Sequence, residues 1–489
     1  MNLNHVELAR ALSPEAALTL GALLVLGIDL IFFKRAQPSV RLRSASLTAA
    51  AAIVTAFVFS FCNHASPTAL ESVLALDKLA VATRCGALGL SFLVLGITSL
   101  APTPRHSAEY IALLLFATAG ITLMAVAQHL LVAFLALELT SLSLYALVAF
   151  DTHRREATEA ALKYFLFGGV SAAFLLFSFS LLYGLTGAVD LRGVAHALAH
   201  QNGSPLLALA LVMMLVAFGY KTAAAPFHLW APDAYQGAPT PIAALIASGS
   251  KLGGLIMFSR LLWPSLLTGT AANDSAHSGL AWLSTLALLS AASLVLGNIA
   301  ALAQSNIRRL LAYSAIAHAG SLLLGVMIAG PAGAGPLYYY ALTYGIATAG
   351  AFGVIAAVER NASCQQISDL AGLSRRSPLL AGCLLVFILS LAGIPPLAGF
   401  FGKFFVFSAA LKVGGLAAWE GQLALAAILL SVVSLYYYLL VLKQAWITPV
   451  ADNAAGQIRV SPVGAIALVL AASAIVLLGV FPNYLLGGV

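Results

Sequence analysis

The sequence is built from apolar runs that are each long enough to cross a lipid bilayer as a helix. A helix rises about 1.5 Å per residue, so about 20 apolar residues cross a hydrocarbon core about 30 Å thick. Backbone groups inside lipid must be hydrogen-bonded within the chain, and a helix achieves this within one segment. We therefore predict an all-α polytopic membrane protein with about fourteen transmembrane helices, at residues 13–33, 44–62, 76–99, 110–127, 129–150, 157–184, 205–227, 239–263, 279–303, 309–330, 335–358, 379–411, 420–446 and 461–486.

The composition agrees with a protein that lies almost entirely within the membrane. The 489 residues are 61% hydrophobic and only 8% charged, which excludes a soluble globular domain. The net charge of +7 does not indicate a nucleic-acid partner, because the basic residues are dispersed between the apolar runs. The connections are mostly short, so we expect one membrane domain over residues 1–489 without a soluble appendage.

The basic residues instead predict the topology. The odd-numbered connections are rich in lysine and arginine, whereas the N-terminus and the even-numbered connections carry few. Because basic loops stay in the cytoplasm, both termini are expected on the opposite side of the membrane. The first apolar run has no basic segment before it, so we interpret it as a retained helix and not as a cleaved signal peptide.

The stretch from Phe218 to Lys251 carries the most unusual chemistry in the chain. Lys221 follows a long apolar run, and Pro226 cannot donate the backbone hydrogen bond that a continuing helix requires. We expect the helix to kink or break just after Lys221. Lys251 lies near the middle of the next apolar run. A charge at this depth costs roughly 2.5–3.5 kcal/mol to insert, so both lysines are candidate functional residues.

A second apolar run is interrupted at Pro395 and Pro396, and Lys403 follows about two turns later. The two broken spans are the seventh and the twelfth, an odd number apart, so they cross the membrane in opposite directions. Paired proline-interrupted segments at corresponding positions indicate an inverted-repeat transporter fold with its site near the membrane centre.

Glu138 lies close to the centre of the fifth predicted span and is the only acid predicted so deep. Opposite charges at short range stabilise the ionised form of each other. If Glu138 approaches Lys221, the lysine holds its proton; if the two part, the lysine can release it to another base. The alternative is a static buried ion pair that fixes two helices together.

Charged residues near the ends of the spans have structural and functional interpretations. Lys163 follows Glu159 by four residues, so the two could form a surface ion pair, and a functional role for Lys163 is equally open. The residues Asp77, Lys78 and Arg84 are expected to include an interfacial pair, although Arg84 is deep for one.

Three further polar residues lie beside or within the spans. His228 and Asp233 follow the break at Pro226, where they could bond the free backbone groups or supply protons to Lys221. His318 lies inside the tenth span. A buried histidine bonded to a carbonyl is the favoured interpretation there, and a relay role is the alternative.

The sequence lacks the motifs that bind nucleotides or redox cofactors. It contains no G-x-x-x-x-G-K-[ST] phosphate loop and no G-x-G-x-x-G motif after a strand. The cysteines form no C-x-x-C pair, which argues against an iron–sulfur site or a disulfide framework: Cys62, Cys85, Cys364 and Cys383. We expect no metal or cofactor in this chain, so proton movement must be energised by another polypeptide or an ion gradient.

Four motifs carry a specific resemblance to a known family. The segments ALELTSLSLYAL, KTAAAPFHLWAPDAYQGAPTP, QSNIRRLLAYSAIAHAG and LAGIPPLAGFFGKF closely resemble subunit N of bacterial respiratory complex I, the NADH–quinone oxidoreductase. The resemblance implies an antiporter-like subunit with two inverted five-helix repeats and broken seventh and twelfth helices. In this chain the three N-terminal helices would occupy 13–99, the first repeat 110–263, the second repeat 279–446 and the last helix 461–486.

The same resemblance implies a relay of charged residues through the membrane centre. The positions that match the family's relay are Glu138, Lys163, Lys221, Lys251 and Lys403. Lysine at 403 is similar to subunit N, because the sister subunit M has glutamate there. The chain also ends soon after the fourteenth span, without the long lateral helix that marks subunit L.

The resemblance implies a proton-translocating subunit that does no redox chemistry itself. NADH, FMN, iron–sulfur clusters and quinone are expected in partner subunits, which comprise the other membrane and peripheral subunits of complex I, including the other antiporter-like subunits. We expect a multi-pass protein of the bacterial inner membrane, in contact with lipid but not nucleic acid, with both termini in the periplasm. Two alternatives remain open: a subunit of a multisubunit Na⁺/H⁺ antiporter, and a purely structural membrane subunit.

Overall fold

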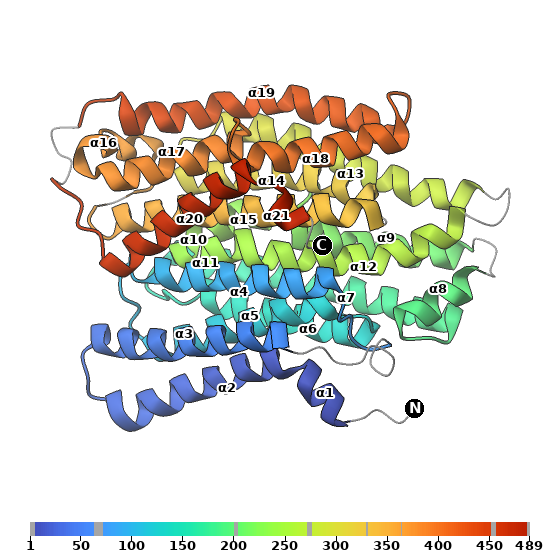
Figure 1. The fold of residues 1–489 in the computed structure, drawn as a ribbon, viewed down its shortest axis with the longest axis horizontal. Helices are drawn as coiled ribbons and strands as arrows, with labels where there is room; N and C mark the ends of the chain where they lie inside the picture. The colour runs from blue at the N-terminus through green and yellow to red at the C-terminus, as the bar shows by residue number, and fades with distance from the viewer. Residues whose placement is uncertain are drawn as a thin grey trace.

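Most of the long helices lie side by side along the long axis of the molecule in the computed structural model (Figure 1). The structure describes residues 5–62, 72–199, 204–270, 276–328, 331–362, 364–450 and 456–486. Within these ranges, 13 helices are long and apolar enough to cross a membrane, and the shorter Pro378–Ala392 forms a fourteenth span with the helix after it. The prediction of an all-α membrane protein with about fourteen spans is confirmed.

The helices follow one another through mostly short connections. In chain order they are α1 (His5–Ala11), α2 (Ser13–Ile28), α3 (Pro38–Cys62), α4 (Lys78–Thr98), α5 (Ser107–Val126), α6 (Leu130–Val148), α7 (Arg155–Thr186), α8 (Leu191–Ala199), α9 (Pro205–Thr222), α10 (Trp230–Gly237), α11 (Thr240–Leu245), α12 (Lys251–Thr270), α13 (Ala276–Leu302), α14 (Ile307–Met327), α15 (Pro331–Glu359), α16 (Leu373–Arg376), α17 (Pro378–Ala392), α18 (Ala398–Gly414), α19 (Trp419–Trp446), α20 (Pro462–Val480) and α21 (Asn483–Leu486). Two π-helical turns, Asp29–Phe33 and Ile246–Ser250, and a 3₁₀ turn, Ile367–Leu370, complete the helical segments.

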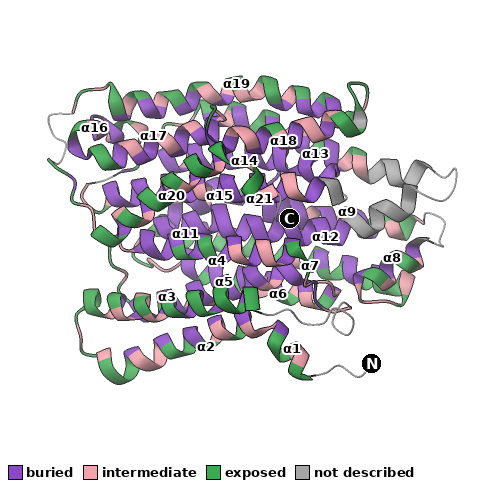
Figure 2. Cartoon of the chain, viewed as in Figure 1, coloured by how far each residue is buried: buried purple, intermediate pink, exposed green. Residues whose placement is uncertain are grey.

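The outer helices expose apolar side chains. α2 and α3 form an outer layer against α5, and Figure 2 shows more exposed surface on them than on the central helices. Large apolar side chains point outward here and on α7 and α19, among them Leu23, Leu47, Phe167 and Leu429. Such a surface is unfavourable in water but suits the hydrocarbon of a bilayer.

Two sets of five spans pack in the same way. In the first set α5 packs against α6 and α12, and α7 packs against both α9 and α10. In the second set α13 packs against α14 and α19, and α15 packs against both α17 and α18. The sets begin five spans apart in a chain whose spans alternate in direction, so one set is inverted relative to the other. This packing agrees with the predicted pair of inverted repeats.

Both predicted helix breaks are present. α9 ends at Ala223, which is left-handed with φ 57°, and α17 ends at Gly393, which is left-handed with φ 86°. Glycine adopts this conformation readily because it has no Cβ. One backbone N–H freed by the first break finds its acceptor on another helix: the Ala225 N–H donates a hydrogen bond to Ser293 Oγ of α13 at 2.8 Å. The gaps contain the predicted helix breakers, Pro226, Pro395 and Pro396.

The eighth predicted span, 239–263, is confirmed as the continuous helical span Thr240–Leu262. Within it the π-helical turn Ile246–Ser250 separates α11 from α12 immediately before Lys251, a detail that the hydropathy does not predict. Such turns are rare and occur frequently at functional sites. The segment IASGS contains neither a proline nor a charge, so nothing in the local sequence signals the interruption.

Candidate functional site

Three lysines lie buried inside the helix bundle. Their exposed fractions are 5% for Lys221, 3% for Lys251 and 8% for Lys403. Lys221 is in the last turn of α9 before the first break, Lys251 opens α12 after the π turn, and Lys403 is in the second turn of α18 after the second break. Each lysine therefore lies where a regular helix is interrupted.

Lys221 lies between α6 and α12. Its Nζ donates to Ser141 Oγ of α6 at 3.4 Å, and a Cβ added at Gly254 of α12 would be 2.9 Å from Lys221 Cγ. Glu138 lies one turn before Ser141 on α6 and is half buried, and its buried Oε1 has no hydrogen-bond partner among the residues that the structure describes. The charges of Glu138 and Lys221 interact, but no ion pair joins them in the described part of the chain. The alternative of a static ion pair is therefore wrong for this structure.

Lys251 contacts the backbone of α14 and an aromatic ring of α15. Its Nζ donates to the Ala315 carbonyl oxygen at 2.8 Å and lies 5.2 Å from the centre of the Tyr344 ring. A carbonyl dipole and an aromatic face both stabilise a cation. The Tyr344 hydroxyl is buried near Thr348, and neither group forms a hydrogen bond of normal geometry with any described residue.

His318 of α14 lies within reach of the charges of both Lys251 and Lys403. Its Nδ1 is 2.7 Å from the Tyr340 hydroxyl of α15, and its Nε2 is 3.2 Å from the Tyr438 hydroxyl of α19. The expected histidine bonded to a carbonyl is wrong, because both ring nitrogens meet hydroxyl groups supplied by other helices. A hydroxyl can donate or accept, so either ring nitrogen can carry the proton.

Lys403 lies beside the second break. Its Nζ donates to the carbonyl oxygen of Ala392, the last residue of α17, at 3.1 Å and to Ser431 Oγ of α19 at 3.4 Å. A carbonyl at a helix end has no donor within its own helix, so it is free to accept from the lysine. A small cavity of about 20 Å³ adjoins Lys403 and is also lined by His318 and Ser321.

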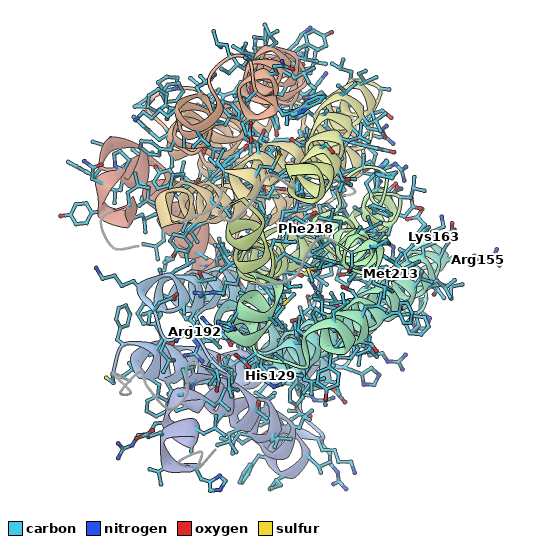
Figure 3. All side chains as sticks on the ribbon, turned by 90° about the vertical axis from the view of Figure 1, so that its right-hand side faces the viewer. His129, Arg155, Lys163, Arg192, Met213 and Phe218 are labelled. Carbon is cyan, nitrogen blue, oxygen red and sulfur yellow. The ribbon has the colours of Figure 1, made fainter. Side chains whose placement is uncertain are left out.

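Lys163 lies apart from the three buried lysines. Its side chain is 40% exposed and pairs with Glu159 at 2.5 Å and with Asp233 at 2.8 Å. The predicted surface pair with Glu159 is confirmed. Figure 3 shows Lys163 near Arg155 at the edge of the molecule, whereas Phe218, three residues before Lys221, lies inside the bundle.

One expectation was that Asp233 of α10 bonds the backbone groups freed by the break. It does not. It accepts from Lys163 and from Arg309 Nη1, the latter at 2.7 Å. Burial alone would raise the pKa of the Asp233 carboxyl, but hydrogen bonds from these two cations hold it below its ordinary value. His228 is half buried with an unpartnered Nδ1, and no hydrogen bond connects His228 or Asp233 to Lys221 in the described residues.

A buried polar network near Lys163 contains residues that sequence reasoning did not select. Arg308 pairs with Glu359, and the Glu359 carboxylate also accepts from Thr240. Arg308 Nη1 donates to the Gln236 carbonyl at 2.9 Å and to the Ala238 carbonyl at 3.1 Å. The network joins α10, α11, α14 and α15. The sequence signal for this network is an acid, Glu359, at the end of an apolar run, beside arginines that the distribution of charge explains by topology alone.

The charges near the third span do not form the expected interfacial pair. Arg84, only 2% exposed, pairs with Glu15 of α2 at 2.9 Å, and Asp77 pairs with Arg260 of α12 at 2.6 Å. Glu15, in the first turn of α2, is 8% exposed, so an acid at the end of a span is buried as well. Both pairs connect residues from different spans.

Comparisons with known proteins agree on one family. Residues 127–442 match the family described as NADH:quinone oxidoreductase/Mrp antiporter, TM. The chain is 45% identical over 499 residues to NADH-quinone oxidoreductase subunit N 2 of Acidobacterium capsulatum, covering 99% of this chain and 98% of the relative. The chain belongs to the subunit N family of NADH-quinone oxidoreductase. Another family member, subunit N of Heliobacterium modesticaldum, is 40% identical over 380 residues, which cover 78% of this chain and 77% of the relative.

Solved structures extend this family relationship. A chain of respiratory complex I from Thermus thermophilus with bound aureothin is 35% identical, with a TM-score of 0.79 over 97% of this chain and 98% of that one. A chain of the Mrp complex from Dietzia sp. has a TM-score of 0.80 over 97% and 96% of the two chains but only 20% identity, so it shows the shared fold alone. This subunit N family member is a multi-pass membrane protein, and the likeness supports its membership in a multisubunit complex.

The tyrosines around His318 are the other site residues that sequence reasoning missed. Tyr340 and Tyr438 each end a run of three tyrosines, at 338–340 and 436–438, in subunit N spans that pack near α14. Three consecutive tyrosines within an apolar span are a sequence signal that hydroxyl groups lie inside the bundle. For metals, the described residues contain no group of three or more His, Cys, Asp or Glu side chains that could hold an ion.

Proposed function

We propose that this chain is the proton-translocating membrane subunit of an NADH–quinone oxidoreductase, the respiratory complex I of its family. The observation that carries the proposal is the burial of three lysines inside the bundle, Lys221, Lys251 and Lys403. An unpaired charge inside a membrane protein costs several kcal/mol, which fold stability alone does not explain. In the described residues none of the three pairs with a carboxylate.

In this proposal the proton passes from Lys221 and Lys251 through His318 to Lys403. Glu138 tunes the first step, because its carboxylate interacts with Lys221 without being locked to it. Approach of the carboxylate favours protonated Lys221, and withdrawal favours release of the proton.

We assign the groups around α10 to the entrance of this route. Lys163 matches the sixth-helix lysine of the family, is partly exposed and shares Asp233 with Arg309. These groups lie at the ends of α7, α10 and α14, which the positive-inside rule assigns to the cytoplasm. His228 lies between this cluster and the first break along the chain and is a candidate to pass protons inward.

The driving reaction belongs to partner subunits. NADH, FMN, iron–sulfur clusters and quinone would be bound there, and their reaction would change the separation of Glu138 and Lys221. The partners would be other membrane and peripheral subunits of complex I, in a bacterial inner membrane with both termini of this chain in the periplasm. The proposed domain boundaries are 13–99 for the N-terminal helices, 110–263 and 279–446 for the repeats and 461–486 for the last helix; the shared packing of the two repeats supports them.

The test is the proton yield of the assembled complex in proteoliposomes. Lys221→Ala should lower the number of protons pumped per NADH oxidised, whereas Lys412→Ala, which removes an exposed lysine near the end of α18, should leave it unchanged. An unchanged yield for assembled Lys221→Ala complex would refute the role of Lys221. Sodium-dependent proton exchange without NADH oxidation would favour the antiporter alternative, and impaired assembly with normal pumping would favour a structural subunit.

A further inference from the structure

Two tyrosine hydroxyls hold both ring nitrogens of His318. The three side chains come from α14, α15 and α19 and are 6%, 1% and 0% exposed for His318, Tyr340 and Tyr438. The Tyr438 hydroxyl also forms a short hydrogen bond with Ser314 Oγ, one turn before His318 on α14. These contacts form a continuous hydrogen-bonded row of Ser314, Tyr438, His318 and Tyr340.

We propose that Tyr438 and Tyr340 are proton-carrying members of the relay, one on each side of His318. The inference rests on the proposed function of the chain as a proton translocator. It assigns the route between Lys251 and Lys403 to side-chain hydroxyls.

The Lys251 end of the row is fixed by α14. Lys251 Nζ donates to the carbonyl of Ala315, the residue next to Ser314. A carbonyl accepts hydrogen bonds but cannot pass a proton on, whereas a hydroxyl can do both. Ser314, which precedes that acceptor residue on α14, is therefore the hydroxyl at the Lys251 end of the row.

The Lys403 end of the row is fixed by α18. Tyr340 packs on Gly402, the residue before Lys403, where an added Cβ would fall 2.7 Å from Tyr340 Cδ2. Ser321 lies beside the Tyr340 hydroxyl and lines the cavity that His318 and Lys403 also line. A proton that leaves Tyr340 is thus delivered next to the cavity of Lys403.

The chemistry of imidazole allows a proton to pass along the row. A neutral ring donates at one nitrogen and accepts at the other, so one tyrosine donates to His318 while the other accepts from it. When Tyr438 gives its proton to Nε2 it takes one from Ser314, and Ser314 takes the proton that Lys251 releases. The imidazolium then releases the Nδ1 proton to Tyr340, whose own proton passes to Ser321 and on toward Lys403. One proton enters and one leaves, every hydroxyl ends neutral, and the ring ends in its other tautomer.

The experiment uses the intact complex in proteoliposomes and measures protons pumped per NADH oxidised. Tyr438→Phe and Tyr340→Phe are compared with Lys403→Met as the benchmark for a blocked route. We expect each phenylalanine variant to lower the yield by the same factor as Lys403→Met, and the double variant to lower it no further. A structural role would change the amount of assembled complex but not the yield of the complex that assembles.

Two neighbouring tyrosines on α15 serve as matched controls. The hydroxyls of Tyr338 and Tyr339 donate to the carbonyls of Ala82 and Leu478 at 2.7 and 2.8 Å, away from His318. Tyr338→Phe and Tyr339→Phe remove the same atom from the same helix and should keep the wild-type yield.

The outcomes separate this inference from the proposed function. Wild-type yields for Tyr438→Phe and Tyr340→Phe beside a reduced yield for Lys403→Met would overturn the inference alone. A wild-type yield for Lys403→Met would overturn the assigned role of Lys403 and the route to it. If the phenylalanine variants do not assemble, Ser314→Ala, a smaller change at the same row, must lower the yield, and a wild-type yield from it overturns the inference.

Discussion

Removing one partner of the buried Arg84–Glu15 pair should destabilise the packing of α2 on α4 and α5 by about 3–5 kcal/mol. The two side chains are only 3% and 10% exposed. Arg84 Nε and Nη2 donate to the carboxylate oxygens at 3.1 and 2.9 Å, and Nη2 also donates to the Ala11 carbonyl at 3.1 Å. Arg84→Met leaves the buried Glu15 carboxylate without its partner charge, and Glu15→Gln leaves the buried Arg84 guanidinium without its partner charge.

The magnitude follows from the burial of both charges. Water and salt screen an exposed charge that loses its partner, but they reach this pair poorly. A cost of about 3–5 kcal/mol corresponds to roughly two to four powers of ten in an equilibrium constant. Replacing both residues, by Glu15→Leu together with Arg84→Met, removes both buried charges, and such replacements are often neutral or stabilising.

The assay is a double-mutant cycle on the intact complex, read as the amount assembled in membranes and the midpoint of thermal inactivation after purification. Both single variants should fall well below wild type, and the double variant should return close to it. Arg43→Met, which removes an exposed charge from α3, is the control and should have little effect. If the double variant is as unstable as the two single losses combined, uncompensated charge is not the cause and the reasoning fails.

Two further predictions concern the pairing of helices. Burial alone would raise the pKa of the Asp77 carboxyl, but the hydrogen bonds and charge of Arg260 hold it below its ordinary value. The Asp77–Arg260 pair therefore stabilises the fold at neutral pH, and this contribution is lost as the pH falls below about 4 and the carboxylate takes up a proton. The Asp77 side chain is 51% exposed, so Asp77→Asn should lower the free energy of unfolding by under about 1 kcal/mol. The variant should have a lower midpoint of thermal inactivation than wild type at neutral pH, and the two midpoints should converge in acid. A Cβ at Gly399 would lie 1.9 Å from the Ser390 carbonyl oxygen, so Gly399→Ala should force α17 and α18 apart and reduce the amount of assembled complex on native gels. Gly382→Ala on α17 is the control: no described atom lies within 4 Å of a Cβ added there, so this variant should assemble normally.

The sequence was sufficient for features that depend on local chemistry. Spans follow from hydrophobic length, and both breaks follow from prolines that cannot donate a backbone hydrogen bond. Lys221, Lys251 and Lys403 were identifiable because a charge inside an apolar run is costly wherever the run packs. The structure buries all three of these lysines inside the protein, so none of them faces lipid.

Partners in space were beyond local reasoning. Arg84 meets Glu15, 69 positions earlier, and Asp77 meets Arg260, 183 positions later, and no periodicity connects such residues. His318 is the clearest example within the site. Its place in a span was evident, but only the meeting of α14, α15 and α19 decides that its nitrogens face hydroxyls and not a carbonyl.

The two breaks hold their lysines by different means, and this difference bears on the direction of proton movement. Lys221 precedes its break and contacts the side chain of Ser141, with the unlocked carboxylate of Glu138 one turn away. Lys403 follows its break and also contacts a serine, Ser431, but it donates in addition to a backbone carbonyl that the break itself frees, at Ala392. No unbonded carboxylate lies beside it in the described residues. A side chain can move while the backbone stays fixed, so in the proposed function the proton affinity of Lys221 is the adjustable one. In the proposed function, Glu138 and Lys221 therefore form the site whose proton affinity changes, and Lys251, His318 and Lys403 follow it along the route.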